Sequence, residues 1–341
     1  MNVPGFILKT LRIIMLKSLI LLLTCLSSAL ASEIDSFTLR YEPLADSAEV
    51  INKHANLLLS QGLGEANKTP GCYKPSLYES LRKRFNSIHK DGELIEFILQ
   101  SPSVSRHTPL RRDSIFRHHR LLDGQILARP SADRGGFGMG STLRFQNHYI
   151  GSDKFEHMFG QGYRYFQNFH IKKKSLALTL KLGILKERTI LGGNPLATGV
   201  FSFADLVANF QGMRFWNHIL QESADVLQEN LGPYVTCSEG KWVMVKKINF
   251  KDYVDAGFDE GQNCLSLATS HATRGVLAEI EALESRATER RYSCPIDSAE
   301  LETAKKRYQI LLPEDSRKQM IGDLLFNPWD EIRQYKGSWK Y

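Results

Sequence analysis

Apolar residues recur at helical spacing along most of this chain, and several runs begin with a capping signal. Asp46-x-x-Glu49 and Ser76-x-x-Glu79 each place a glutamate three residues after an N-cap residue, which satisfies the free amides of a first helical turn. Asp297-x-x-Glu300 repeats this pattern later in the chain. Glycine and proline follow the runs where helices commonly end. The pattern predicts helices over 46–62, 76–88, 93–99, 153–169, 175–186, 203–231, 252–285 with a break near 270, and 297–312.

Two stretches lack helical spacing. Residues 106–141 are basic and contain a glycine-rich run over 135–140, which lacks the Gly-Lys-Ser/Thr ending of a phosphate-binding loop. We interpret these glycines as turn and close-approach residues in a loop with short strands. Residues 235–250 alternate between apolar and polar positions around Gly240, which predicts a β-hairpin.

The longest and most apolar helical runs lie between residues 151 and 231. None reaches the ~18 uninterrupted apolar residues of a membrane-spanning helix, so we expect these helices to pack against one another. The predicted fold is mainly α, with a helical bundle core, a small β-hairpin and a disulfide-stabilised C-terminal region. We divide the chain into a signal (1–31), an N-terminal helical and loop region (32–150), a helical core (151–232), and a C-terminal hairpin with helices (233–341).

The first 31 residues have the pattern of a cleaved secretory signal. Lys9, Arg12 and Lys17 form a basic region, an apolar run follows over 18–26, and Ala29 and Ala31 occupy the small positions before a cleavage site. An uncleaved membrane anchor is the alternative, but the apolar run is short for one. We expect cleavage after Ala31 and a mature protein outside the cytoplasm.

The cysteines fit export. Besides Cys25 in the signal, the chain has Cys72, Cys237, Cys264 and Cys294, and no C-x-x-C pair occurs. Two disulfides are expected in an oxidising compartment, and the sequence leaves all three pairings open.

The mature chain is mildly basic. The signal carries three basic and no acidic residues, so its removal lowers the net charge from +7 to +4. This charge is compatible with an anionic membrane or polymer as partner. Nucleic acid is not an expected partner, because no basic block is interleaved with aromatic residues. The one tight cluster, Lys172-Lys173-Lys174, is interpreted as a solvated connection between helices.

Candidate chemistry lies in the helical core. Asp153 and His157 are four residues apart, as are Asp205 and Asn209, so the members of each pair share a helix face. Glu187 lies near the end of the intervening helix. These five residues are predicted to form one polar cluster. Carboxylates with a histidine suit a divalent metal held by Asp153, His157 and Asp205, or general acid/base catalysis, because burial shifts their pKa values unless a cation or proton is shared.

Helix capping offers a simpler interpretation of both aspartates. Asp153 with Glu156, and Ser202 with Asp205, form capping boxes in which a carboxylate can satisfy helix N-terminal amides. Caps do not require His157 or Asn209. Gly160 and Gly212 follow the two pairs, at positions where two helices could cross closely.

At these residues the chain resembles a family. The motifs are Gly151-Ser152-Asp153-Lys154-x-x-His157, then Lys186-Glu187, then Ser202-x-x-Asp205-Leu206-x-Ala208-Asn209-x-x-Gly212. In this order they resemble the helical core of VanZ-like proteins and of the YfiM-type lipoproteins of bacterial envelopes, over residues 151–212. The resemblance implies a periplasmic or envelope-associated protein, in a family linked to glycopeptide tolerance.

A second group consists of Asp255, Asp259 and Asn263, spaced four apart along a predicted helix. An exposed acidic helix face is the favoured interpretation. A site there would require His118 or His119 nearby.

Two kinds of function follow from the sequence. The first is an envelope protein that binds a lipid-linked or other anionic component through the polar cluster, with a divalent metal and peripheral membrane contact as further expectations. A metal-dependent or acid/base hydrolase is its enzymatic variant. The second is a structural interaction protein of the periplasm, in which the same residues only hold helices together.

Overall fold

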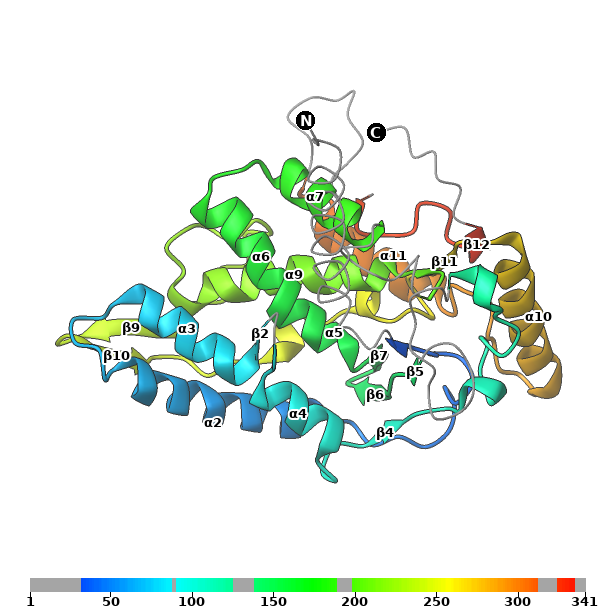
Figure 1. Ribbon diagram of the computed structural model, residues 1–341, viewed down its shortest axis with the longest axis horizontal. Helices are drawn as coiled ribbons and strands as arrows, with labels where there is room; N and C mark the ends of the chain where they lie inside the picture. The colour runs from blue at the N-terminus through cyan, green and yellow to red at the C-terminus, as the bar shows by residue number, and fades with distance from the viewer. Residues whose placement is uncertain (1–31, 88–89, 125–137, 189–197, 312–323, 335–341) are drawn as a thin grey trace, which may run out of the picture.

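The computed structural model describes residues 32–87, 90–124, 138–188, 198–311 and 324–334. The predicted signal, residues 135–137 of the glycine-rich run and the end of the chain after residue 334 lie outside these ranges. Within them the protein is mainly helical, as the pattern predicted. Figure 1 shows one helix, α9, crossing the middle of the molecule, with α2, α3 and α4 on one side and α10 at one end.

Three helices form the N-terminal part: α2 (Ala48–Ala66), α3 (Lys74–Phe85) and α4 (Glu93–Gln100). Helix α3 begins two residues before Ser76, so the predicted capping box of Ser76 lies inside the helix. The apolar stripe of α2, including Ile51, Ala55 and Leu59, is fully buried. This stripe packs α2 against α3 and α4.

The core contains one long helical run that the pattern predicted as a single α-helix. It consists of α5 (Asp153–Glu156), the π-helical segment η4 (His157–Gln161), α6 (Gly162–Phe166) and a second π-helical segment, η5 (Gln167–Ile171). It is followed by α7 (Leu176–Arg188). Helical spacing cannot predict the π segments, which add a residue per turn and occur frequently at functional sites.

Helix α9 (Phe203–Leu220) is buried over nearly its whole length. The prediction that it extends to Leu231 was wrong. The helix ends at Gln221, which has a left-handed backbone (φ 45°), and the chain then folds back. Asp225 on the returning segment pairs with Arg214 of α9 at 2.7 Å, and this buried ion pair stabilises the reversal.

Short strands surround the helices. The predicted hairpin is present as β9 (Val235–Ser238) and β10 (Lys241–Met244). The predicted strands near 106–141 are also present, and the remaining pairings join distant segments. They are β1 (Ser32–Glu33) parallel to β5 (Gly138–Met139); β2 (Asn86–Ser87) with β3 (Lys90–Asp91); the sheet β4 (Arg106–His107), β6 (Thr142–Phe145), β7 (His148–Gly151); and the sheet β12 (Arg333–Gln334), β11 (Ser266–Leu267), β8 (Val200–Phe201).

The C-terminal part contains α10 (Ser270–Arg286) and α11 (Ser298–Tyr308). Asp297 caps α11 as predicted, by accepting from the amides of Ala299 and Glu300. The predicted helix over 252–269 is absent. Only single 3-10 turns occur there, η6 (Phe250–Asp252) and η7 (Ala256–Phe258); the other 3-10 turns described are η1 (Arg111–Asp113) and η2 (Leu121–Asp123).

Two disulfides are present, Cys72–Cys237 and Cys264–Cys294. The second lies in the C-terminal region as predicted, whereas the first joins the segment before α3 to the hairpin. Disulfides are typical of oxidising compartments outside the cytoplasm. In the part of the chain that the structure describes, no helix is both long and apolar enough to cross a membrane.

Candidate functional site

Two short strands lead into the helices that carry the candidate site. Strand β7 runs directly into α5, and β8 runs into α9, where Ser202 caps the helix by accepting from the amide of Asp205. The two helical runs cross at glycine. A Cβ on Gly162 would lie 2.5 Å from Cα of Gly212, so only glycines allow this approach. Gly212 was predicted at the crossing. Its close neighbours are Gly162 and Met158, whereas the sequence had suggested Gly160.

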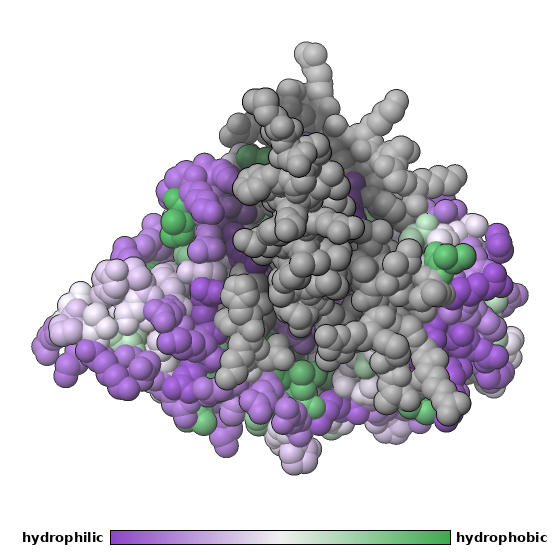
Figure 2. All heavy atoms as spheres, viewed as in Figure 1, coloured by the Kyte–Doolittle hydropathy of each residue, from purple (hydrophilic) through white to green (hydrophobic). Residues whose placement is uncertain are grey.

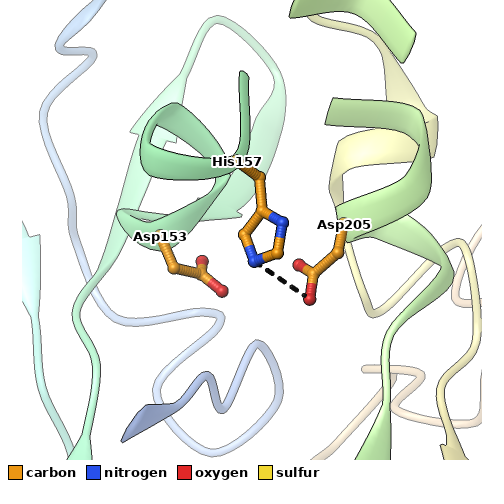
Figure 3. A group of neighbouring side chains, drawn as sticks. All are labelled: Asp153, His157 and Asp205. Carbon is orange, nitrogen blue, oxygen red and sulfur yellow. Dashed lines mark ion pairs between the residues drawn. The ribbon is translucent and has the colours of Figure 1, made fainter. Parts of the chain in front are cut away.

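All five predicted residues lie together between these helices. The Nε2 atom of His157 is 3.3 Å from Oδ2 of Asp205, and its Nδ1 atom is 3.2 Å from Oδ1 of Asn209. Glu187, on α7, accepts a hydrogen bond from Nδ2 of Asn209 at 3.3 Å. Figure 3 shows Asp153 and His157 on one helical run, facing Asp205 on the next.

The simple capping interpretation does not describe Asp153. The N-cap residue of α5 is Ser152, and no side-chain cap hydrogen bond forms there. Asp153 instead accepts a hydrogen bond from Lys154 at 2.9 Å. Asp205 lies in the first turn of α9, but its carboxylate contacts Lys154 and His157. Both aspartates therefore contribute to the cluster.

Sequence reasoning missed the cation at the centre of the cluster. Lys154 is completely buried, and its Nζ atom lies 2.6 Å from Asp205, 2.7 Å from Glu260 and 2.9 Å from Asp153. Lys154 was visible as the second residue of the Asp-Lys-x-x-His motif. A buried lysine needs carboxylate partners, so the lysine between Asp153 and His157 is the sequence feature that could have indicated an acidic cluster around it.

Glu33 and Glu260 were also missed. Glu260 lies just after η7 and accepts from Ser202 at 2.7 Å, while its Oε2 atom has no hydrogen-bond partner among the described residues. Glu33, in β1, is 5% exposed, and its charge interacts with Glu260 and Asp205. Glu33 is positioned by the pairing of β1 with β5, and Glu260 lies in an irregular segment, so no local pattern reveals either residue.

The carboxyl groups of the cluster fall into two kinds, one with a lowered pKa and the others with a raised pKa. Burial opposes ionisation of Asp205, but the charges of His157 and Lys154 outweigh burial and lower its pKa. Burial raises the pKa of Asp153 and of Glu187, and raises that of Glu260 to about 7. Burial, with the charge of Glu260, holds the pKa of Glu33 well above its ordinary value. Asp205 is thus the firmly ionised member.

For the two basic groups, burial lowers the pKa and the neighbouring carboxylates raise it. Burial alone would lower the pKa of Lys154, but Asp153, Asp205 and Glu260 raise it well above its ordinary value. For His157, burial is likewise outweighed by Asp205 and Glu187, so its pKa is raised. In this part of the described chain, five carboxyl groups therefore interact with Lys154, His157 and, at Glu187, Lys186, and the cluster has an excess of acidic groups.

The hydrogen bonds also fix the tautomer of His157. Because Glu187 accepts from the amide nitrogen of Asn209, the amide oxygen of Asn209 faces His157 and must accept from Nδ1. The Nε2 atom then has two options. It carries a second proton toward Asp205, or it offers a lone pair to a cation. An imidazole whose other nitrogen donates to an oxygen is the usual arrangement of a metal-binding histidine.

A cation could be held by Asp153, His157 and Asp205. One ligand atom from each lies within 4.8 Å of the others. Asp205 is 2% exposed, whereas the side chains of Asp153 and His157 are 21% and 17% exposed, so the group opens on the side of α5 and η4.

The second predicted group does not form an acidic helix face. Asp259 is buried and pairs with Arg40 at 2.7 Å, and buried Asn263 donates to the backbone of Gly257 and Leu325. Glycines at 257 and 261 interrupt the spacing that predicted a helix. His118 pairs instead with Glu279 of α10 at 2.8 Å. His119 is buried, and burial lowers its pKa to about 4.

No family model, curated protein or solved structure matches this chain.

Proposed function

We propose that this protein is an exported cell-envelope protein whose polar cluster binds a divalent cation through Asp153, His157 and Asp205, and through that cation an anionic group of an envelope component. The observation that carries the proposal is the chain Glu187–Asn209–His157, which leaves Nε2 of His157 directed at Asp205. With Nδ1 donating to Asn209, the lone pair of Nε2 in the neutral imidazole is available to a cation beside Asp205.

The ligand set suits a borderline or hard cation. Two carboxylates and one imidazole bind zinc, manganese or iron(II). Lys154 contacts Oδ1 of Asp205 and leaves Oδ2 beside His157. The lysine thus neutralises one side of the cluster without occupying the other.

The cation explains how an acidic cluster could bind an anion. A cluster in which carboxyl groups outnumber cations does not attract a phosphate or carboxylate, whereas a divalent ion with three protein ligands retains positions for its oxygens. The resemblance to VanZ-like and YfiM-type envelope proteins supports an envelope component as the anion's source. The same open positions could hold water, which favours a metal-dependent hydrolase as the second candidate.

Calorimetry on the mature chain tests the proposal. After EDTA treatment and dialysis, we expect one Zn²⁺ or Mn²⁺ per chain, and no stoichiometric binding in Asp153→Asn, His157→Gln or Asp205→Asn. Asp113→Asn, at an exposed aspartate, is the matched control and should bind as wild type. Inorganic phosphate should bind the cation-loaded protein and not the cation-free one.

A structural role predicts different results. Wild-type protein would bind no cation, and the three site variants would lower the free energy of unfolding by about 1–3 kcal/mol for each buried group left unpaired. If the cation binds but phosphate does not, the metal part of the proposal survives and the anion part is wrong. Turnover of a phosphodiester by the cation-loaded protein would favour the hydrolase.

A further inference from the structure

Helix α7 has two faces of opposite character. Its inner face, which includes Gly183, Ile184 and Glu187, is buried. On its outer face, Leu178 and Leu185 are 45% and 57% exposed. At about 100° per residue, these two leucines and the half-buried Leu182 fall within about 60° of one another, opposite Glu187.

A further exposed apolar side chain lies just before the helix. Ile171, the last residue of η5, is 62% exposed and directly precedes Lys172-Lys173-Lys174. In Figure 2 the coloured part of the face is mostly hydrophilic, with small groups of hydrophobic spheres at several places, one of them near the outer end of the helical run α6–η5. Single exposed apolar residues are ordinary on a protein surface, but Leu178 and Leu185 share one face of α7, and we call them, with Ile171 on the preceding segment, the apolar stripe.

Charge around this stripe is strongly one-sided. Between residues 157 and 204 the sequence has seven basic residues and one acidic residue. The acidic one, Glu187, is buried on the inner face of α7. Lys172, Lys173 and Lys181 are exposed beside the apolar side chains.

We propose that α7 and the preceding turn form a membrane-docking surface for an anionic lipid bilayer. We define this surface by Ile171, Leu178 and Leu185, with Lys172–Lys174 and Lys181. Leucine and isoleucine enter the boundary between headgroups and acyl chains, and the lysines contact anionic headgroups. The complementarity of charge selects this occupant: among the described residues from 157 to 188, exposed lysines lie beside exposed leucine and isoleucine and no acid is exposed, which matches anionic headgroups above acyl chains.

Docking would hold the polar cluster near the membrane, with α7 between the cluster and the lipid. Glu187 lies on the same helix as the docking surface, on its opposite face, and contacts Asn209. This link rests on the proposed function, and it identifies the anionic component as a lipid headgroup. The docking surface itself needs no cation, so membrane binding is tested separately in EDTA.

Another basic surface serves as a control. A groove of about 420 Å³ between α2 and the segment after β10 is lined by Lys53, Lys247 and Lys251. Its exposed apolar neighbours, Leu57 one turn after Lys53 on α2 and Val245 two residues before Lys247, lie on separate elements, and Lys251 is paired with Glu49. If basic charge alone drives vesicle binding, neutralising this groove should weaken binding as much as neutralising the docking surface.

Vesicle flotation of the mature chain in EDTA tests the proposal. We expect binding to phosphatidylcholine vesicles containing one quarter phosphatidylglycerol, and little binding to phosphatidylcholine alone. Leu178→Gln with Leu185→Gln should lower the partition coefficient at least about tenfold. Lys172→Gln, Lys173→Gln and Lys174→Gln together should do the same and remove the preference for anionic vesicles.

Two control variants make the same kinds of substitution at other exposed positions. Leu57→Gln with Val245→Gln replaces leucine and valine side chains that are 52% and 54% exposed, and Lys53→Gln with Lys247→Gln neutralises the groove. Both should bind as wild type. Absence of wild-type binding to anionic vesicles, wild-type binding by either docking-surface variant, or an equal loss in the controls would each overturn the proposal. Neither the vesicle assay nor its outcome depends on whether the cluster binds a cation.

Discussion

Replacing Glu260 with glutamine should stabilise the protein at alkaline pH. Glu260 is 1% exposed, and burial raises its pKa from the ordinary 4.5 to about 7. Between these values the folded protein retains a proton that the unfolded chain has released, so the free energy of unfolding falls as pH rises. At about 1.4 kcal/mol per pH unit, this window corresponds to about 3 kcal/mol. The amide of the Glu260→Gln variant would keep a carbonyl oxygen for Lys154 and Ser202, without the charge.

The sign of the effect depends on pH. Below pH 4.5, wild type and Glu260→Gln should have similar stability, because the wild-type carboxyl is neutral in both states. Above pH 7 the variant should be more stable by up to about 3 kcal/mol. Denaturant unfolding from pH 4 to 8.5, in EDTA and with disulfides intact, measures the difference. The exposed Glu96→Gln of α4 is the control and should run parallel to wild type.

A Glu260→Gln stability curve parallel to that of wild type across this range would contradict the expected effect. A variant less stable than wild type at pH 8 would refute it equally. Either result would mean that the charge of Lys154 fully compensates an ionised Glu260, contrary to the excess of carboxyl groups around it.

Two further predictions concern the helices that build the cluster. Asn209→Ala removes the acceptor that orients His157 and should weaken cation binding about 10- to 100-fold in calorimetry, whereas Asn217→Ala, two turns further along α9, should leave it unchanged; equal affinities would contradict the orienting role. Gly212→Ala would press a methyl group into the backbone of Met158 and Gly162 and should lower the free energy of unfolding by about 1–3 kcal/mol, whereas Gly64→Ala, which points into open space on α2, should not.

Local patterns predicted the elements with strong apolar spacing. The helices at 48–66, 93–100 and 176–188 lie within about two to four residues of their predicted bounds, because the spacing of apolar residues is set within a few helical turns. The end of α9 was missed because the reversal after Leu220 depends on Arg214 and Asp225. A contact between a helix and the segment after it cannot be predicted from the spacing of apolar residues.

The convergence of Asp153, His157, Glu187, Asp205 and Asn209 followed from helical spacing on three helices. The contributions of Glu33 and Glu260 could not be predicted this way. Glu33 comes from a two-residue strand, and Glu260 from an irregular segment near β11, which pairs with β8. Asp255 and Asp259, spaced four apart, also suggested a helix over 255–263. Instead, each accepts a hydrogen bond from the backbone amide two residues later, at Gly257 and Gly261.

The Cys72–Cys237 bond has a consequence for a protein exposed to proteases. It closes a covalent ring around every residue from 73 to 236, which includes all five residues of the predicted cluster. A single cleavage anywhere in that ring would leave both pieces joined as one molecule, and the opposing helices could not diffuse apart. Hydrolysis of a peptide bond near the cluster therefore need not separate its residues, provided that the bridge stays oxidised.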